Sequence, residues 1–145
     1  MCGIPLRENV TKLQNIFKID RDGRQLLNWQ ELCDLPQMSK YEIQTKCFER
    51  LPFCEQVKQV YWGDILIANH GSALVMTAFA RKGSVMIDLI PGKLRNPDLK
   101  LIAYYSGVRY LEFVNMNDTY TGYRYIGSDW NTYNVSNFCL VCVCI

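Results

Sequence analysis

Apolar positions are grouped along this chain into short segments separated by turn-forming residues. Five segments rich in apolar and β-branched residues have the length and the flanking turns of β-strands. We predict strands over residues 15–19, 41–48, 64–68, 85–90 and 108–114. The third and fourth are almost uninterrupted apolar runs, which is typical of strands buried on both faces of a sheet.

Helical patterns occupy the stretches between these strands. Asn28 is followed three positions later by Glu31, a pair that resembles a capping box and predicts a helix start. Residues 52–62 begin with a proline and carry apolar side chains at helical spacing, which predicts a second helix.

Two further helices are expected later in the chain. Residues 73–80 should be helical, with Arg81 in the last turn and Gly83 just beyond it, and residues 97–105 should end at Gly107. Strands that alternate with helices indicate an α/β fold with a mostly parallel sheet, right-handed crossovers and helices on both faces, as in Rossmann-like proteins.

Length and composition agree with one globular domain spanning residues 1–145. Of the residues, 49% are hydrophobic and 21% are charged, and the net charge is +2. This small excess does not indicate nucleic acid as a partner. No apolar run approaches the roughly 20 residues that cross a bilayer, so we expect no membrane span, and the first residues lack a signal-peptide pattern.

The cysteines and sequons bear on the cellular compartment. Seven cysteines leave at least one unpaired, and the Cys-x-x-Cys spacing of Cys139 and Cys142 lacks the second pair of a zinc site, so no metal is expected. Buried thiols and disulfides formed in an oxidising lumen stay open as alternatives. Asn-x-Ser/Thr sequons occur at Asn9, Asn117 and Asn134 and matter only in the secretory pathway.

The sharpest junction for chemistry follows the strand at 64–68. Parallel sheets bind ligands beyond the carboxyl ends of their strands, and here the chain continues as His70, Gly71 and Ser72 into a predicted helix. The small residues allow a close approach to the main chain, and the first amides of a helix suit a pyrophosphate. His70 could donate to a phosphate oxygen, or it could be a structural histidine at a strand end.

The longer run Asp-Ile-Leu-Ile-Ala-Asn-His-Gly-Ser-Ala-Leu at 64–74 resembles the His-Gly-Ala segment of glycosyltransferase family sixty-one. That family includes transferases acting on EGF domains, on O-mannosylated protein and on plant xylan. Three other segments resemble the family in the same order: the arginine–arginine–asparagine pattern at 21–32, the Glu55-Gln56 pair, and a closing segment at 131–138 that implies a last helix over 137–144.

The resemblance implies the C-terminal, donor-binding lobe of a two-lobed GT-B enzyme. Such an enzyme would transfer a sugar, with inversion, from a nucleotide sugar of the UDP type to a protein or polysaccharide hydroxyl in the endoplasmic reticulum or Golgi lumen. His70, Gly71 and Ser72 would hold the diphosphate of this donor. The UDP-sugar would be a substrate; the family implies no certain cofactor.

Each of the other carried-over residues has two possible roles. Arg21 and Arg24 would offset phosphate charge, or would belong to a solvated turn. Asn28 would cap its helix or reach the ligand. Asp88 is expected to end its strand and bind ribose hydroxyls, or else to form a helix cap or loop ion pair. Glu55 could be only an exposed helical acid.

Two departures limit the carry-over. Ser72 and Ala73 stand where many members have Ala-Gly, which puts the sugar preference in question. The N-terminal lobe, which would supply acceptor contacts, is not in this chain. An inverting transfer needs a base near the acceptor hydroxyl, and His70 is a candidate only if the acceptor approaches it directly.

Three functional classes therefore remain. The first is the donor lobe of a transferase, and the second is a non-catalytic nucleotide-binding or interaction module, which the upstream genomic sequence would distinguish. A small enzyme of another class is disfavoured because no phosphate-loop, Gly-x-Gly-x-x-Gly or Gly-x-Ser-x-Gly pattern occurs. The ending Cys142 to Ile145 superficially fits a prenylation motif, although a hydrophobic helix end explains it better.

Overall fold

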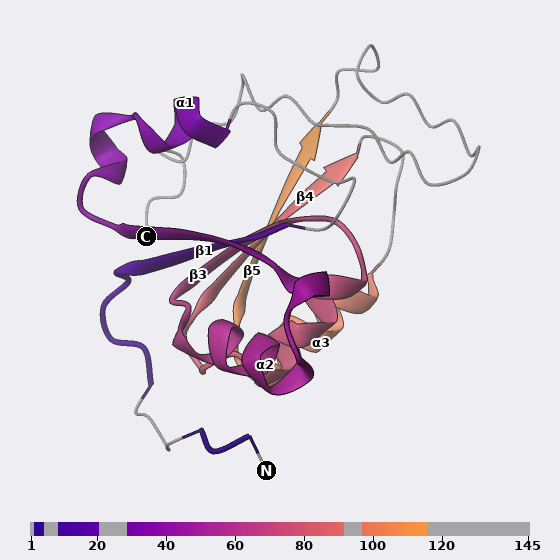
Figure 1. The fold of residues 1–145 in the computed structure, drawn as a ribbon. Coiled ribbons are helices and arrows are strands. Elements are labelled where there is room, and N and C mark those ends of the chain that lie inside the picture. The colour runs from indigo at the N-terminus through magenta and orange to yellow at the C-terminus, as the bar shows by residue number, and fades with distance from the viewer. Residues whose placement is uncertain (1, 5–8, 21–28, 92–96, 116–145) are drawn as a thin grey trace.

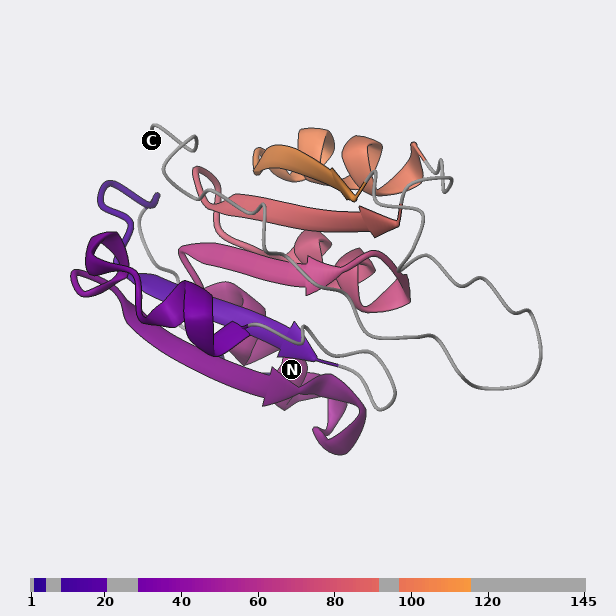
Figure 2. The ribbon, with the colours of Figure 1, turned by 90° about the horizontal axis from the view of Figure 1, so that it is seen from above.

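The computed structural model describes residues 2–4, 9–20, 29–91 and 97–115. They form a five-stranded parallel sheet with helices on both faces (Figure 1). The strands are β1 (Asn15–Asp20), β2 (Glu42–Cys47), β3 (Ile65–Asn69), β4 (Val85–Pro91) and β5 (Arg109–Asn115). Their order is β2-β1-β3-β4-β5, and all of them point the same way (Figure 2). The predicted α/β fold is confirmed, and every predicted strand is present within one residue at each end.

The connecting helices divide between the two faces of the sheet. They are α1 (Trp29–Cys33), α2 (Phe53–Trp62), α3 (Asp98–Ser106) and the 3₁₀ helices η1 (Pro36–Met38), η2 (Phe48–Arg50) and η3 (Ser72–Phe79). Side chains of α1 and η1 pack on one face, and those of α2, η3 and α3 pack on the other. The connection from β1 to β2 crosses the sheet in the opposite direction to the later ones. A right-handed crossover therefore places α1 on the opposite face.

The core has two apolar layers, because successive residues of each strand face opposite sides of the sheet. The layer under α1 contains the buried residues Ile16, Leu32, Met38, Ile65, Ile67, Val85, Ile87 and Leu89. The layer under the other helices contains Phe17, Ile19, Phe48, Val60, Leu66, Ala68, Leu74, Met86, Leu99, Ala103 and Val108. Burial of β3 and β4 from both sides accounts for their almost uninterrupted apolar runs.

Residues 72–79 form a 3₁₀ helix, so the prediction of an ordinary helix over 73–80 was right in position and wrong in type. The amide of Leu74 bonds to the carbonyl of Gly71 at 3.0 Å, an i to i+3 bond. The buried hydroxyl of Thr77 donates to the Leu74 carbonyl at 2.6 Å and lies 3.1 Å from Met86 Sδ. This side-chain bond to the helix backbone favours the tighter winding. The expected glycine cap of α3 is confirmed at Gly107, whose φ is 69°.

A buried carboxylate fixes the amino edge of the sheet. Asp64 Oδ2 accepts the backbone N–H groups of Gln14 at 2.9 Å and Asn15 at 2.8 Å, and Oδ1 accepts the guanidinium of Arg81. Arg81 Nε also donates to the carbonyl of Tyr61 at 2.7 Å. The Asp64–Arg81 pair thus ties together the starts of β1 and β3, the end of α2 and the turn before β4. Arg81, expected in the last turn of a helix, instead follows η3 and is buried.

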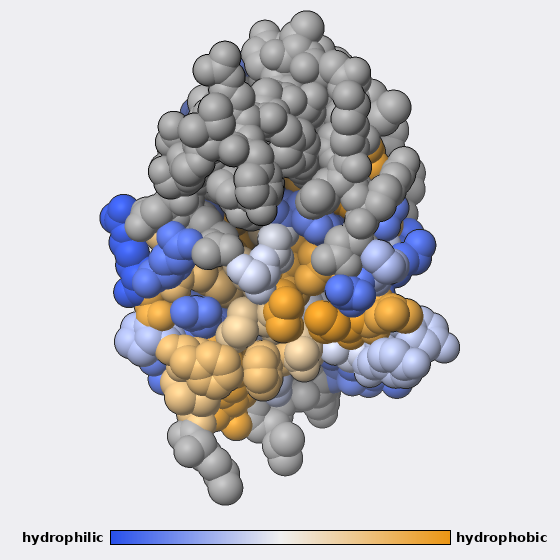
Figure 3. Space-filling view, turned by 90° about the vertical axis from the view of Figure 1, so that its right-hand side faces the viewer, coloured by the Kyte–Doolittle hydropathy of each residue, from blue (hydrophilic) through white to orange (hydrophobic). Residues whose placement is uncertain are grey.

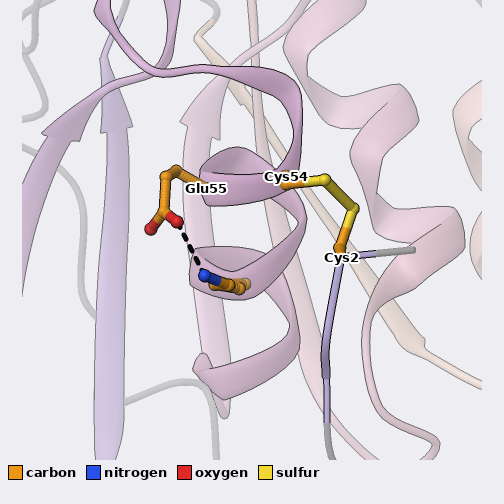
Figure 4. The surroundings of a disulfide bond; sticks show 4 residues. Cys2, Cys54 and Glu55 are labelled. Atoms are coloured by element: carbon orange, nitrogen blue, oxygen red, sulfur yellow. Dashed lines mark hydrogen bonds and ion pairs between the residues drawn. A yellow bond between two sulfur atoms is a disulfide. The ribbon is translucent and has the colours of Figure 1, made fainter.

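A disulfide joins Cys2 to Cys54 in the first turn of α2 (Figure 4). The Cα atoms are 5.1 Å apart and 52 residues separate the two cysteines along the chain. Cys33 and Cys47 carry no disulfide, and the other three cysteines lie outside the described residues. Of the two alternatives left open for the cysteines, disulfide formation therefore applies to this pair.

The helical layer formed by α2, η3 and α3 exposes several large apolar side chains. Phe53 and Phe79 connect α2 with η3 through an edge-to-face contact of 5.7 Å between ring centroids. Val75 and Leu101 are also exposed, and Figure 3 shows an apolar band across one side of the molecule. No helix in the described ranges is long and apolar enough to cross a bilayer.

Replacing Asp64 should destabilise the whole fold. In Asp64→Ala, Arg81 and two backbone N–H groups lose a buried acceptor, so the free energy of unfolding should fall by about 3–5 kcal/mol. Urea unfolding followed by circular dichroism measures this. Glu55→Ala is the control, because the Glu55–Lys58 pair at 2.7 Å is partly exposed and is worth less than about 1 kcal/mol. Equal losses in both variants would contradict the assigned role of Asp64.

Breaking the Cys2–Cys54 bond should also lower stability. Closing a loop of 52 residues restricts the unfolded chain and stabilises the fold by up to about 4 kcal/mol. Cys54→Ser should therefore unfold at a lower temperature than the unmodified chain in a thermal scan without reductant. Cys33→Ser retains the bond and should unfold close to the unmodified chain. A Cys54→Ser midpoint equal to that of Cys33→Ser would count against the disulfide.

Candidate functional site

The helices that follow β1 and β3 lie on opposite faces of the sheet, and we name the region beyond the carboxyl ends of these strands, next to Asp20 and His70, the crevice. The two strands are neighbours, with Ile19 opposite Ala68. β1 continues toward α1 on one face, whereas β3 continues into η3 on the other. Such a change of direction is where open α/β sheets with this strand order bind ligands. Both predicted binding segments, 21–28 and 70–72, directly follow these two strands.

His70 stands at the carboxyl end of β3 and is held by its backbone and its ring. Its N–H donates to the carbonyl of Leu89 at 2.9 Å, which continues the ladder with β4 by one residue. Its side chain is 5% exposed, and Nδ1 lies 2.8 Å from Asp88 Oδ2. Which group donates in this bond depends on the tautomer of the ring.

Asp88 lies inside β4 and is completely buried. The prediction that it ends its strand is wrong: β4 runs Val85–Pro91, three residues further. The position tolerates a carboxylate because two donors meet it, His70 Nδ1 and the hydroxyl of Tyr110 at 2.6 Å. Both contact Oδ2, whereas Oδ1 is buried without a hydrogen-bond partner in the described part of the chain.

Tyr110 was not singled out from the sequence, although it belongs to this group. Burial raises the pKa of its hydroxyl well above the ordinary value, and the hydrogen bond to Asp88 and the charges of Asp88 and Glu112 raise it further. The hydroxyl therefore stays protonated and remains a donor. The only local signal was a tyrosine within a predicted strand; its partner is 22 positions away.

A second polar group missed by the sequence analysis lies at the end of β1, on the face of α1. Lys18 is 6% exposed, and its ammonium is 2.7 Å from Asp20 and 5.3 Å from the centroid of Trp29. Burial and then the charge of Asp34 raise the pKa of the nearby Cys33 thiol, while Lys18 acts in the opposite direction. A lysine between apolar strand residues was the available signal. Because Lys18 is paired, its charge is largely compensated locally.

Some of the other candidates lie within the described residues, and some lie outside them. Gly71 precedes η3 and Ser72 begins it, so both lie at the crevice beside His70. Glu55 is partly exposed and bonds Lys58 (Figure 4), which is the exposed-acid alternative. Asn9 is exposed. The following predictions lie outside the described residues: Arg21, Arg24, Asn28, Asn117, Asn134, the helix over 137–144 and the cysteines of the ending. Within the described ranges, no three His, Cys, Asp or Glu side chains are grouped to hold a metal.

Comparison with known proteins places this geometry in a family. The family model described as Glycosyltransferase 61 matches residues 7–87, more than half of the chain. The chain belongs to the glycosyltransferase 61 family. It is also 36% identical over 89 residues to a Drosophila melanogaster protein named EGF domain-specific O-linked N-acetylglucosamine transferase. That alignment covers 60% of this chain and 17% of the relative.

The family match includes the segments after both β1 and β3, and it ends one residue before Asp88. The predicted membership is therefore confirmed for the region that contains His70 and the crevice. The closing segment at 131–138 lies beyond the matched residues and stays a prediction.

Asp88→Ala should reveal the cost of leaving two buried donors unpaired. His70 and Tyr110 would each lose an acceptor, so we expect the free energy of unfolding to fall by about 3 kcal/mol in urea titrations. Glu112 pairs with Asp88 across the ladder and is exposed, so Glu112→Gln should change stability by less than about 0.5 kcal/mol. A matching small change in Asp88→Ala would show that the carboxylate does not hold these donors.

Proposed function

We propose that this chain forms the donor site of an inverting glycosyltransferase and binds a nucleotide sugar of the UDP type. The observation that supports this most is the position of the His70-Gly71-Ser72 turn. It directly follows β3, at the crevice beyond the paired carboxyl ends of β1 and β3, and it falls within the residues matched by the family model.

The chemistry of the crevice suits a diphosphate. Backbone N–H groups in the first turn of η3 present partial positive charge to an anion. His70 adds an imidazole fixed beside them, through its second nitrogen, Nε2. Arg21 and Arg24 follow β1 in the sequence, and a guanidinium fork matches phosphate oxygens. Asn28 is proposed to cap α1.

The described geometry changes the role proposed for Asp88. A completely buried carboxylate bonded to His70 and Tyr110 is better suited to orienting the imidazole than to binding a ribose. We therefore place Asp88 behind His70 in the site. The nucleoside would contact other residues of the crevice.

The proposed enzyme context comes from the family. The sheet would be the donor half of a GT-B enzyme, which transfers the sugar to a protein or glycan hydroxyl. The name of the Drosophila relative supports N-acetylglucosamine as the sugar and a protein as the acceptor. The Cys2–Cys54 disulfide supports the lumen of the endoplasmic reticulum or Golgi as the compartment, since such bonds form in oxidising environments.

A non-catalytic nucleotide-binding module is the second candidate. It is favoured by the low exposure of the His70 side chain, 5%, because a general base must reach the acceptor hydroxyl in addition to the donor. Both candidates share the donor site, and an assay for sugar transfer by the chain separates them.

Calorimetric titration with uridine diphosphate tests the donor site. His70→Ala and Arg24→Ala should each weaken binding about tenfold or more, because a hydrogen bond to a charged group is lost. Arg109→Ala is the matched control. It removes the same charge, but Arg109 begins β5 at the opposite edge of the sheet, so the affinity should be retained. Unchanged affinity in both site variants would remove the proposed site.

A further inference from the structure

Three side chains form one hydrogen-bonded series. Tyr110 lies in β5, Asp88 lies in β4, and His70 directly follows β3. We propose that Tyr110 and Asp88 are positioning residues that keep a proton on Nδ1 of His70 and fix the plane of its ring. His70 then acts on a bound ligand only through Nε2. The part that concerns the ligand rests on the proposed function; the positioning does not.

The register of the sheet places the three residues together. Asp88 lies between Ala68 of β3 and Glu112 of β5. Tyr110 is two residues before Glu112, and His70 is two residues after Ala68. Side chains two apart in an extended strand share a face. Tyr110 and His70 therefore approach Asp88 diagonally from opposite sides, a distance that long side chains can span.

The two donors converge on a single oxygen of the carboxylate. His70 Nδ1 is 2.8 Å and the Tyr110 hydroxyl is 2.6 Å from Asp88 Oδ2, while Oδ1 has no partner among the described residues. This asymmetry defines the rotation of the carboxylate. Without the tyrosine hydroxyl, either oxygen could meet Nδ1, and the ring would lose a fixed partner.

Burial strengthens the hydrogen bonds of this series, and the tyrosine hydroxyl fixes which groups donate. Asp88 is 0% exposed and the His70 side chain is 5% exposed, so water competes little for these bonds and each bond is stronger than in solvent. The raised pKa of Tyr110 keeps its hydroxyl a donor. With tyrosine donating and the carboxylate accepting, the ring nitrogen that faces Asp88 must carry a proton.

The hydrogen bond to Asp88 decides which ring nitrogen of His70 can contact a ligand. A partner on one imidazole nitrogen decides how the other nitrogen meets a ligand. With Nδ1–H held by Asp88, neutral His70 offers Nε2 as an acceptor and cationic His70 offers it as a donor. Only the charged form suits a diphosphate oxygen, whereas the neutral form suits a ligand hydroxyl.

The chain contains a single histidine, so nuclear magnetic resonance can read this imidazole without overlap. Protein labelled with ¹⁵N-histidine reports which ring nitrogen holds the proton and how fast that proton exchanges with water. The variants are Tyr110→Phe, which removes only the hydroxyl, and Asp88→Asn, whose amide can donate to Nδ1. Tyr104→Phe is the matched control because Tyr104 is 76% exposed on α3.

We expect a proton on Nδ1 in the unmodified chain and in Tyr104→Phe, and a shift toward the Nε2–H tautomer in Asp88→Asn. Exchange of the Nδ1 proton should become about fivefold faster in Tyr110→Phe, which corresponds to one lost hydrogen bond. A purely structural tyrosine would alter stability but leave the tautomer and the exchange rate unchanged.

A neutral ring that carries its proton on Nε2 in the unmodified chain would overturn the assignment of Nδ1. Unchanged exchange in Tyr110→Phe would overturn the role of Tyr110. Uridine diphosphate added to the same samples separates the two proposals: if the tautomer and exchange results hold and the nucleotide does not bind, the donor-site proposal fails and the positioning stands.

Discussion

The Asp64 carboxylate is the interaction on which the rest of the sheet depends. It meets the backbone of β1 and the guanidinium of Arg81 in the interior of the protein, and its own backbone bonds to Asn15 and Val85. The starts of β1, β3 and β4 are therefore fixed relative to one another along the strand direction. Register errors would move every apolar side chain to the wrong face, so this anchor protects both core layers and the alignment of the opposite edge.

Two buried carboxylates lie on the sheet face that α2, η3 and α3 cover, one near each end of the strands, and their surroundings differ. Asp64 has partners on both oxygens, in keeping with a structural role. Asp88 has two donors on one oxygen and none, among the described residues, on the other. Incompletely satisfied buried groups are costly. Natural proteins accept this cost mostly where function requires it, and Asp88 stands directly behind the crevice.

Much of the fold could be predicted because the central strands bury both faces, and a continuous apolar run as short as 65–68 is typical of such a strand. The type of η3 could not be predicted, since the segment is apolar on nearly all sides and its spacing does not distinguish a 3₁₀ helix from an ordinary one. Strand order was also hidden, because local patterns do not show which strands pair. His70 was found from its turn, whereas Tyr110 and Lys18 acquire meaning only through partners that the sheet brings near.

The disulfide encloses β1 but not β3, the two strands whose carboxyl ends border the crevice. The covalent ring closed by Cys2 and Cys54 contains β1, α1 and β2. Strands β3 to β5 follow Cys54 in the sequence and lie outside this ring. Within the described residues, strands β3 to β5 are held by non-covalent contacts alone. Thiol reduction would thus free the chain segment from Cys2 to Cys54, whereas the His70–Asp88 contact lies outside the covalent ring.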